Sequence, residues 1–582
     1  MKNHVFIHDA TNKNWLHFQN PVEIIEAQHL DEIIPKLHNL ERFTQQQELF
    51  CAGFISYEAA PAFDSALRVR ALETFPLLWF GLYTHPDIIK IPAPPCKSSG
   101  IALNWQETIS PSAFEQNICR IKERIARGET YQVNYTFALQ APFHENAWEL
   151  FLNLVRSQQS LYAAFVDTGK YCICCASPEL FFQLDGKQLS SRPMKGTTSR
   201  GLTFAEDEMQ AQWLHSSGKN RAENVMIVDM IRNDMGRLAE VGSVEAPRMF
   251  EVERYPTLWQ MTSTITSQTN ASICNILAAL FPCASVTGAP KPKTMEIIAE
   301  LEATPRGIYT GCIGFIAPKR KAQFNVAIRT VVIDKEAQQA SYHVGSGIVW
   351  DSRGEEEYRE CLIKARVLTE KLPEFSLLET MLWRPKEGIF LLPQHLRRLR
   401  KSAAYFNFDV EMKHIEQILT EKTAHLPPTF HKVRLTVSAD GTASCEVAPI
   451  ILHNPCPPVR LRPAKLPIDP NNVFLYHKTT HRRIYEDALT SCPGCDDVLM
   501  WNKRHEVTET TIASVIVQFG GRLFTPPIRC GLLPGTYREW LLEQGRVSER
   551  IITLEELEKA EHIYLVNSVR RRRIASLITP IS

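Results

Sequence analysis

The spacing of apolar and polar residues predicts a mixture of helices and buried strands in the first two thirds of the chain. A capping serine, Ser110, and the proline after it open one predicted helix, and Gly128 ends it. Its apolar residues recur at helical spacing: Phe114, Ile118, Ile121 and Ile125. Continuous apolar runs predict buried strands at 51–58, 162–165 and 314–316. A segment rich in proline and serine, 88–100, is expected to be a surface loop. Since helices and strands do not alternate strictly, we expect an α+β fold rather than a doubly wound parallel sheet.

The pattern changes abruptly once. A helical spacing over 355–371 stops at a stretch that contains proline, which disfavours helix in the residue before it. At 582 residues the chain is also too long for one hydrophobic core. We therefore predict two domains, 1–370 and 377–582, joined by a linker at 371–376. Residues 1–105 are expected to contribute to the fold of the first domain.

Composition and charge exclude several function classes. Apolar residues make up 44% of the chain and charged residues 22%, as in water-soluble globular proteins. The 65 Lys and Arg residues balance 64 Asp and Glu residues, so no excess charge is available to attract nucleic acid or anionic lipid. No apolar segment has the length of a membrane span or the form of a signal peptide. Together with irregularly spaced cysteines, this predicts a cytoplasmic protein that binds neither nucleic acid nor membranes.

Polar residues interrupt the apolar pattern of the first domain in four segments, at 192–197, 221–234, 285–291 and 345–360. In the last of them, Glu357 and Glu360 are three residues apart and would share one face of a helix. Paired carboxylates that face a pocket suit Mg²⁺, which prefers oxygen ligands and keeps several waters. Alone, such a pair is more often part of a solvated surface, so the metal site depends on the other segments.

The order of these segments resembles that of the chorismate-utilising enzymes, which include anthranilate synthase component I, aminodeoxychorismate synthase component I and the isochorismate and salicylate synthases. The resemblance runs from about residue 110 to residue 368, with further matching segments at 128–134, 177–179, 305–311 and 327–330. It implies an α+β fold like that of anthranilate synthase component I, in which helices surround an antiparallel β-sandwich core. It also implies that chorismate is the substrate.

The same resemblance implies roles for several residues of the first domain. Glu223 and Glu360, with Glu357 close by, would bind Mg²⁺, and the metal would hold the ring carboxylate of the substrate. The residues expected to contact the substrate, including its enolpyruvyl carboxylate, are Tyr309, Arg329, Gly345, Gly347 and Thr287. An arginine suits a carboxylate because it donates two parallel charge-assisted hydrogen bonds.

Lys195 distinguishes between the activities of this family. The chain reads PMKGT at 193–197, which resembles the aminodeoxychorismate synthases, whereas anthranilate synthases have alanine at the lysine position. A buried lysine can lose its proton and act as a nucleophile. The implied mechanism has this amine attack C2 of chorismate and expel the C4 hydroxyl, after which ammonia enters at C4 and releases the lysine. Synthesis of anthranilate, isochorismate or salicylate stays open as an alternative.

Two parts of the expected machinery are missing from the sequence. Many relatives have a histidine, proposed as the acid for the leaving group, where this chain has Gln260, and an amide cannot act as a general acid. No segment resembles a glutaminase with a cysteine nucleophile, so a separate glutamine amidotransferase subunit is expected to supply the ammonia. A catalytically inactive scaffold for such a subunit is a further alternative, which the intact lysines and carboxylates disfavour.

The second domain contains a basic helix, a histidine–lysine–threonine segment and a glycine-containing turn whose order resembles the class IV aminotransferases. The resemblance covers about residues 377–575 and implies a two-subdomain α/β fold of type IV that binds pyridoxal 5′-phosphate. It implies that Lys478 binds this cofactor covalently and that Glu509 pairs with its pyridine nitrogen. The residues expected at the cofactor phosphate are Arg398, Thr536, Tyr537 and Ser568. Such enzymes are commonly dimers through this domain, so a homodimer is expected.

The resemblance of the second domain does not by itself separate a transaminase from 4-amino-4-deoxychorismate lyase. The fusion favours the lyase, because that enzyme would consume the product expected of the Lys195 site. The chain would then aminate chorismate and eliminate pyruvate to give 4-aminobenzoate for folate biosynthesis. The alternative is an anthranilate, isochorismate or salicylate synthase fused to a class IV aminotransferase.

Overall fold

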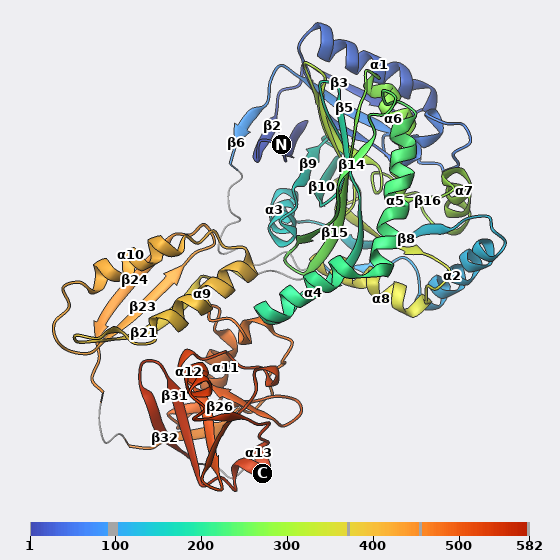
Figure 1. Cartoon of the computed structure of the whole chain (residues 1–582). Helices are drawn as coiled ribbons and strands as arrows, with labels where there is room; N and C mark the ends of the chain where they lie inside the picture. The colour runs from blue at the N-terminus through green and yellow to red at the C-terminus, as the bar shows by residue number, and fades with distance from the viewer. Residues whose placement is uncertain (1, 91–102, 369–372, 453–456, 579–582) are drawn as a thin grey trace. The chain divides into compact units, whose positions relative to one another are not determined.

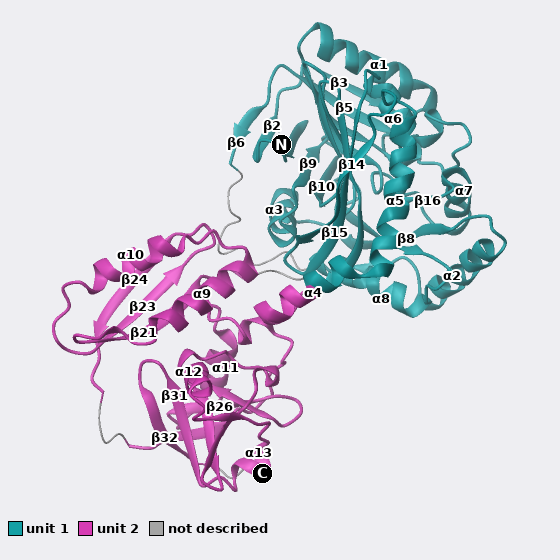
Figure 2. Ribbon diagram, viewed as in Figure 1, with its two compact units in different colours: residues 1–199, 211–372 teal, residues 200–210, 373–582 magenta. Residues whose placement is uncertain are grey.

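The computed structural model describes residues 2–90, 103–368, 373–452 and 457–578. They form two compact units (Figure 2). The first consists of Met1–Ser199 and Ala211–Leu372, and the second of Arg200–Gln210 and Pro373–Ser582. The linker expected at 371–376 lies partly outside the described residues. A short segment in the first half of the sequence thus belongs to the second unit.

Two antiparallel sheets form the centre of the first unit (Figure 1). The strands of the first sheet are β1 (His4–Asp9), β2 (Asn14–Phe18), β6 (Asp87–Ile89), β7 (Gln106–Glu107), β8 (Gln132–Pro142), β9 (Tyr162–Asp167), β10 (Tyr171–Ser177), β16 (Gly288–Ala289), β19 (Thr330–Asp334) and β20 (Gln339–Ile348). Their order is β16-β8-β20-β19-β10-β9-β1-β2-β6, with β7 beside β8. Strand β20 is an interior strand, between β8 and β19, so its glycines have neighbouring strands on both sides.

The second sheet of this unit is also antiparallel. Its strands are β3 (Glu23–Ala27), β4 (Phe50–Ile55), β5 (Leu78–Tyr83), β11 (Leu180–Asp185), β12 (Gln188–Arg192), β13 (Met194–Ser199), β14 (Glu245–Arg254), β15 (Leu258–Gln268), β17 (Cys312–Ala317) and β18 (Lys321–Val326). Their order is β13-β15-β12-β11-β18-β17-β4-β5-β3, with β14 beside β15. Strand β13, which carries Lys195, is therefore at one end of this order.

The hydrophobic core lies between and outside these sheets. One buried cluster joins Val5 and Val166 of the first sheet to Phe54 and Trp79 of the second. Two further clusters pack helices on the outer faces, because each helix has an apolar stripe at helical spacing. These helices are α1 (Leu30–Gln46), α2 (Pro111–Ala126), α3 (Ala147–Gln158), α5 (Gly218–Gly236), α6 (Ile273–Leu280), α7 (Lys291–Leu301) and α8 (Gly354–Ala365).

The predicted fold class is confirmed, and most predicted elements are present. Helix α2 begins after Ser110, whose hydroxyl oxygen accepts a hydrogen bond from the Ala113 amide at 3.2 Å. The apolar runs at 51–58, 162–165 and 314–316 lie in or overlap β4, β9 and β17. The predicted loop at 88–100 begins within β6, and most of it lies outside the described residues.

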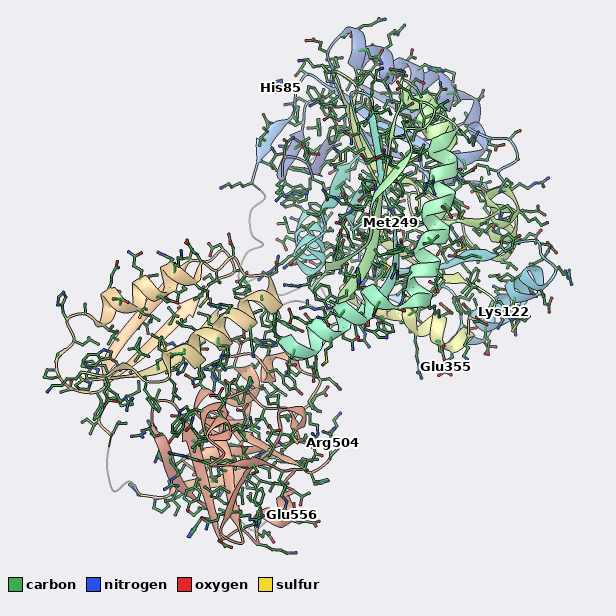
Figure 3. The ribbon with its side chains drawn as sticks, viewed as in Figure 1. His85, Lys122, Met249, Glu355, Arg504 and Glu556 are labelled. Atoms are coloured by element: carbon green, nitrogen blue, oxygen red, sulfur yellow. The ribbon has the colours of Figure 1, made fainter. Side chains whose placement is uncertain are left out.

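The helix predicted over 355–371 was too long. Helix α8 ends at Ala365, and a 3₁₀ turn, Arg366–Leu368, follows it. This turn buries Leu368 in the same cluster as the helix, so an apolar spacing continues where the helix does not. The rest of the predicted helix lies outside the described residues. At the other end, Glu355 is exposed in the first turn of α8 (Figure 3).

The second unit contains two sheets with their own cores, as expected for a two-subdomain fold. A four-stranded sheet of order β22-β21-β23-β24 packs against two helices. These elements are β21 (Leu377–Arg384), β22 (Gly388–Ile389), β23 (His431–Val437), β24 (Ala443–Pro449), α9 (Leu392–Phe406) and α10 (Met412–Thr423). Helix α9 joins the cluster through Leu399 and Ala403, and α10 through Ile415 and Leu419.

An eight-stranded mixed sheet forms the other subdomain, in the order β27-β26-β25-β32-β31-β28-β29-β30. Its elements are β25 (Val459–Pro463), β26 (Asp497–Trp501), β27 (Val507–Thr510), β28 (Ser514–Phe519), β29 (Arg522–Thr525), β30 (Ser548–Glu549), β31 (His562–Asn567), β32 (Arg571–Leu577), α11 (Arg483–Ser491), α12 (Thr536–Glu543) and α13 (Leu554–Leu557). Strands β25 and β26 pair in parallel, and β27 and β28 are antiparallel neighbours that bracket a tight turn.

Residues 200–210 group with this second unit (Figure 2). They include the first half of helix α4 (Phe204–Ser216), so the division between the units falls inside that helix. Of the helices in the described part of the chain, none is long and apolar enough to cross a membrane.

Candidate functional sites

A cavity of about 470 Å³ in the first unit brings together most of the residues predicted for the first site. It is lined from β13, α5, β15, β20 and α8, and by the segments before β17 and β19. The predicted residues that line it are Lys195, Glu223, Gln260, Tyr309, Arg329, Gly345, Gly347, Glu357 and Glu360. Predicted residues as far apart in sequence as Lys195 and Glu360 therefore share one pocket.

Lys195 reaches this cavity from β13, and its amine lies close to Gly347 of strand β20. A Cβ atom at Gly347 would fall 3.0 Å from Lys195 Nζ and 2.6 Å from Gln132 Nε2, so the glycine makes room for the amine. Burial lowers the pKa of Lys195, and the nearby Lys364 lowers it further, while Glu223, Glu360 and Glu179 oppose the shift. The site thus favours a neutral amine, which is the nucleophilic form.

Gln260 holds the strand of Lys195 in place. Its Nε2 donates to the Gly196 carbonyl at 3.0 Å, and its Oε1 accepts from the Thr197 hydroxyl at 3.1 Å. Both groups of the amide are therefore used to pair β15 with β13. The structure gives Gln260 a role in positioning the lysine strand, which does not replace the missing acid.

Glu179 is a cavity residue to which the sequence assigned no role. It follows β10, and the Ser285 hydroxyl donates to its Oε1 at 2.6 Å. Burial raises the pKa of Glu179 to about 7, although Ser285 and the charge of Lys195 oppose the rise. A carboxyl group with this pKa can carry a proton at neutral pH. The signal in the sequence was that 177–179 is one of the segments that match the chorismate-utilising enzymes, at the end of the buried strand β10.

The three predicted metal ligands line the cavity from two helices. Glu223 is on α5, and Glu357 and Glu360 are on α8. Glu357 accepts a hydrogen bond from the Ser346 hydroxyl, and Lys364 Nζ lies 2.6 Å from Glu360 Oε1. Burial alone would raise the pKa of Glu360, but Lys364, Lys195 and Arg329 hold it below its ordinary value.

These carboxylates fit Mg²⁺ by their chemistry, since they supply anionic oxygen ligands beside a cavity large enough for water and substrate. They are not gathered into a finished cluster: among the described residues, no three carboxylate, imidazole or thiolate groups come together as a metal site. A magnesium ion that takes part of its ligands from substrate and water would suit such an open arrangement.

Tyr309, Arg329 and His343 also line the cavity. Burial raises the pKa of Tyr309, so its hydroxyl keeps its proton, and the His343 ring stacks on it with 5.4 Å between centroids. Arg329 donates to the Lys364 carbonyl. Thr287 is not brought into the lining: its hydroxyl donates to the Cys283 carbonyl at 3.1 Å, away from the cavity residues Ser285 and Val286.

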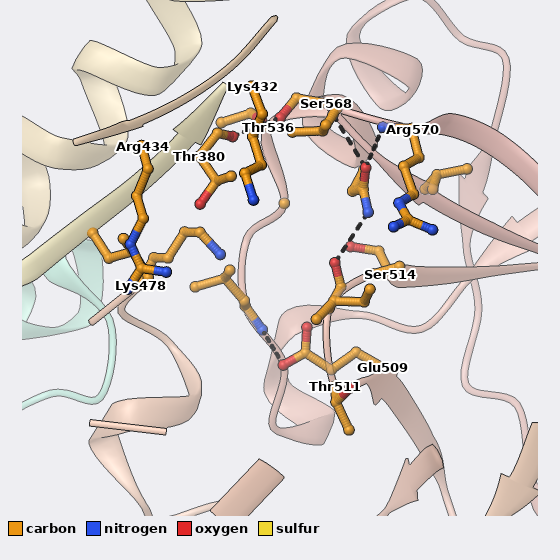
Figure 4. Close-up of a pocket in the computed structure, with 18 of the residues that line it drawn as sticks. Thr380, Lys432, Arg434, Lys478, Glu509, Thr511, Ser514, Thr536, Ser568 and Arg570 are labelled. Atoms are coloured by element: carbon orange, nitrogen blue, oxygen red, sulfur yellow. Dashed lines mark hydrogen bonds between the residues drawn. The ribbon is translucent and has the colours of Figure 1, made fainter. Parts of the chain in front are cut away.

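A second cavity, of about 460 Å³, lies in the second unit between its two subdomains' elements (Figure 4). The predicted residues that line it are Lys478, Glu509, Arg398, Thr536 and Ser568. Lys478 is partly buried at the wall of the cavity, and burial lowers the pKa of its amine to about 8, helped by the charges of Arg398 and Arg482. The amine is thus prepared to condense with an aldehyde.

Glu509 extends from β27 into the same cavity. Tyr485 donates its hydroxyl to Glu509 Oε1 at 2.7 Å, and the Leu533 amide donates to the same oxygen at 3.2 Å. Burial raises the pKa of Glu509 to about 7, against the opposing hydrogen bonds and the charges of Lys478 and Arg482. Such a carboxyl group readily shares a proton with a pyridine nitrogen.

Arg398 is fixed by two residues that the sequence did not single out, Glu379 and His395. Its Nε and Nη2 donate to the Glu379 carboxylate at 2.9 and 2.6 Å, and His395 Nδ1 lies 2.6 Å from Glu379 Oε2. Burial alone would raise the pKa of Glu379, but Arg398 and His395 lower it to about 2. This buried ionic group orients Arg398 toward the cavity, with Nη1 held by the Pro534 carbonyl at 3.1 Å.

Of the other residues predicted at the cofactor phosphate, two line the cavity and one does not. Thr536 starts helix α12 beside the cavity, and the Ser568 hydroxyl donates to the Thr380 carbonyl at 3.2 Å. Tyr537 is not among the lining residues, and its ring packs against Phe390 and Trp540. The group expected from it at the phosphate is its backbone N–H at the start of α12, which does not depend on the ring. The cavity thus offers an amine, a buried acid, an arginine and hydroxyls, which are the groups that pyridoxal phosphate requires.

Lys432 and Arg434 also extend into the second cavity (Figure 4). They occupy alternate positions of β23, whose intervening residues Val433 and Leu435 are buried in the subdomain core. The sequence shows this alternation of basic and apolar residues, but not that the basic face meets the lysine pocket. Two cations at one wall suit a substrate that carries carboxylates.

The fold and the first cavity define the class of protein. Residues 2–370 match the family described as chorismate binding enzyme, which covers more than half of the chain, and the protein belongs to that family. Residues 376–578 match the family described as Amino-transferase class IV.

Individual relatives of the first domain belong to two kinds of synthase. The chain is 39% identical over 269 residues to an aminodeoxychorismate synthase component 1 from Bacillus subtilis, covering 46% of this chain and 57% of that protein. It is 41% identical over 273 residues to an anthranilate synthase component 1 from Haloarcula marismortui, covering 46% and 54%. The chain spans about half the length of these curated relatives.

A solved structure supports the fold. Anthranilate synthase component I from Streptococcus pneumoniae matches with a TM-score of 0.54 and 24% identity, over 64% of this chain and 93% of that one. Since synthases with two different products are similarly close in sequence, the choice between those products depends on the residues of the site.

Proposed function

We propose that the chain converts chorismate to 4-aminobenzoate in two reactions, one in each cavity. The observation that carries this proposal is the buried amine of Lys195 in the first cavity, among the carboxylates Glu179, Glu223 and Glu360. Because burial lowers the pKa of this amine, it loses its proton more readily and can add to chorismate, whereas an alanine at this position could not.

In the first reaction, Lys195 attacks C2 of chorismate while the C4 hydroxyl leaves as water. Glu179 is the group that supports protonation of that hydroxyl, because its pKa of about 7 lets it hold a proton beside Lys195. Ammonia then adds at C4, the bond to Lys195 breaks, and 4-amino-4-deoxychorismate is released. The proton lost by ammonia restores Glu179, so the cycle balances.

The two ends of the substrate are held by different groups. Glu223, Glu357 and Glu360 would hold a Mg²⁺ ion, which would bind the ring carboxylate. Arg329 and Tyr309, which line the same cavity, bind the enolpyruvyl carboxylate. A glutamine amidotransferase subunit supplies the ammonia.

In the second reaction, the chain eliminates pyruvate from 4-amino-4-deoxychorismate. Bound pyridoxal phosphate would accept the electrons of the breaking C–H bond. Lys478 would bind the cofactor aldehyde, and its amine, once free, takes the proton from C4 of the substrate and returns it to the departing enolpyruvyl group, which leaves as pyruvate. Glu509 would keep the pyridine nitrogen protonated. Lys432 and Arg434 bind the substrate carboxylates, which favours this dicarboxylate over a simple amino acid.

The test is product analysis of the purified chain with chorismate, Mg²⁺ and pyridoxal phosphate, with and without ammonium. We expect 4-aminobenzoate and pyruvate in equal amounts, and only with ammonium. Anthranilate would overturn the role given to Lys195. Isochorismate or salicylate formed without ammonium would show water addition instead, and accumulation of 4-amino-4-deoxychorismate without pyruvate would refute the lyase reaction.

A further inference from the structure

Residues 200–210 lie in the sequence between β13, which carries Lys195, and α5, which carries Glu223, yet they pack within the second unit (Figure 2). A buried ion pair folds the segment on itself. Arg200 Nε and Nη2 donate to the two oxygens of Asp207 at 2.6 and 2.7 Å, and these side chains are 7% and 3% exposed. The Gly201 amide donates to the same carboxylate at 3.0 Å.

The segment contacts the last turn of α9 at Tyr405. Arg200 Nη2 donates to the Tyr405 carbonyl at 2.8 Å, and the guanidinium lies 4.3 Å from the centre of the Tyr405 ring. The Tyr405 hydroxyl in turn donates to the Gly201 carbonyl at 2.8 Å. A Cβ atom at Gly201 would fall 2.3 Å from the Asp207 amide nitrogen, so the close approach requires glycine there.

Tyr405 also contacts His477, the residue that precedes Lys478. The rings of Tyr405 and His477 are 4.3 Å apart, and His477 Nδ1 lies 2.9 Å from the Ser402 hydroxyl. Burial lowers the pKa of His477 to about 4, so the ring is neutral at physiological pH. Leu202 packs into the same cluster as Tyr476. One end of α9 therefore supports the backbone from which Lys478 enters the cavity.

The other half of α9 carries Arg398, which faces that cavity. We propose that residues 200–210 are positioning residues of the second site, in which the Arg200–Asp207 pair sets α9 and the His477 ring and thereby fixes Lys478 and Arg398. The inference rests on the proposed function in one respect, that Lys478 binds pyridoxal phosphate. It goes further because a segment of the first enzyme's sequence completes the second enzyme's site.

The experiment compares Arg200→Ala with Arg460→Ala in the full chain. Arg460 also makes a two-point pair with an aspartate, Asp496, but these side chains are 56% and 43% exposed and lie outside the second cavity. Two quantities are measured: the dissociation constant of pyridoxal phosphate, and the pH midpoint of the visible absorbance that the imine with Lys478 gives.

We expect Arg200→Ala to weaken cofactor binding by about tenfold or more, since charged hydrogen bonds to a buried turn are lost. The absorbance midpoint should move by roughly half a pH unit or more, because the distances from Lys478 to Arg398 and Arg482 change. Arg460→Ala should leave both quantities as in the unaltered chain. Arg200→Lys, which keeps the charge but not the forked geometry, should give intermediate values.

If both the midpoint and the dissociation constant are unchanged in Arg200→Ala, the inference is overturned. Weaker cofactor binding without a change of midpoint would also overturn it, because that is the result expected of a residue with only a structural role. If Arg200→Ala lacks a cooperative unfolding transition, Arg200→Lys decides by the same two measurements. Absence of the absorbance from the unaltered chain would instead refute the cofactor proposal, so the two failures are distinguishable.

Discussion

The two lysines occupy cavities of nearly equal size but opposite surroundings. Lys195 is placed among Glu179, Glu223 and Glu360, whose charges favour the ammonium form and oppose the effect of burial. Lys478 has Arg398 and Arg482 beside it, whose charges act in the same direction as burial and lower its pKa to about 8. Burial lowers the pKa of both amines; one cation, Lys364, adds to this effect at the first site, and two cations, Arg398 and Arg482, add to it at the second.

This difference follows from the two proposed reactions. The first site must bind an anionic substrate next to a metal, so carboxylates are needed around the amine and another group must lower its basicity. Lys364, which pairs with Glu360 and donates to the Gly345 carbonyl at 2.9 Å, has that position. The second site must hold a cofactor phosphate, and cations serve both that anion and the lysine.

Replacement of Lys195 should have the largest effect. Lys195→Ala is expected to lower formation of 4-amino-4-deoxychorismate by at least about 10³-fold, because the nucleophile is lost. The absorbance of cofactor bound at Lys478 should stay unchanged. Lys187→Ala, at an exposed lysine, is the control. If Lys195→Ala forms 4-amino-4-deoxychorismate at the rate of the unaltered chain, Lys195 is not a nucleophile, and only one of the two amines takes part in a reaction.

Removal of the acid in the second cavity comes next. Glu509→Ala is expected to slow pyruvate release by several hundredfold, roughly, because the pyridine nitrogen loses the group that keeps it protonated. Tyr485→Phe, which removes only the hydrogen bond to Glu509, should cost about tenfold. The measurement is pyruvate formed from supplied 4-amino-4-deoxychorismate. Equal rates of pyruvate release in the two variants would show that the Glu509 carboxyl group has no role in the reaction beyond its hydrogen bond with Tyr485.

The pH dependence tests Glu179 as the acid of the first site. Its pKa is raised to about 7, so the carboxyl group holds its proton below pH 7 and loses it above. Amination should therefore fall as the pH rises through about 7. Glu179→Gln should be slower by about 10²-fold and lose this decline, whereas the exposed Glu240→Gln should keep the profile. A decline that persists in Glu179→Gln would assign it to another group.

The smallest expected effect concerns substrate binding in the second cavity. Lys432→Ala and Arg434→Ala should each raise the KM for 4-amino-4-deoxychorismate by about tenfold with little change in kcat, because a carboxylate contact is lost. Lys503→Ala, at an exposed lysine outside the lining, serves as the control. Steady-state kinetics of pyruvate release decide; an unchanged KM in both variants would leave the cationic wall without a role in recognition.

The sequence predicted what depends on local spacing and on motifs. Helix α2 and strands β9 and β17 follow from apolar periodicity, since burial of one face fixes both the element and its orientation. Most members of the two sites were also predicted, because their motifs resemble known families. The end of α8 was missed, since the apolar spacing continues through a 3₁₀ turn that buries Leu368.

What the sequence did not show depends on contacts between distant segments. The raised pKa of Glu179 comes from burial beside Ser285, which is 106 residues away. The partners of Arg398 are likewise set by tertiary packing, as is the exclusion of Thr287 and Tyr537 from the cavity linings. Residues 200–210 gave no composition signal that they fold with the second unit.

The placement of residues 200–210 bears on how such a chain could be recombined. A hybrid could be made by replacing residues 373–582 with the corresponding domain of a relative. It would keep Arg200, Gly201 and Asp207, but it would lose Tyr405, with which Arg200 and Gly201 form hydrogen bonds. A working hybrid would have to exchange this short internal segment as well. The second unit is thus not one continuous stretch of the sequence, because these residues belong to it.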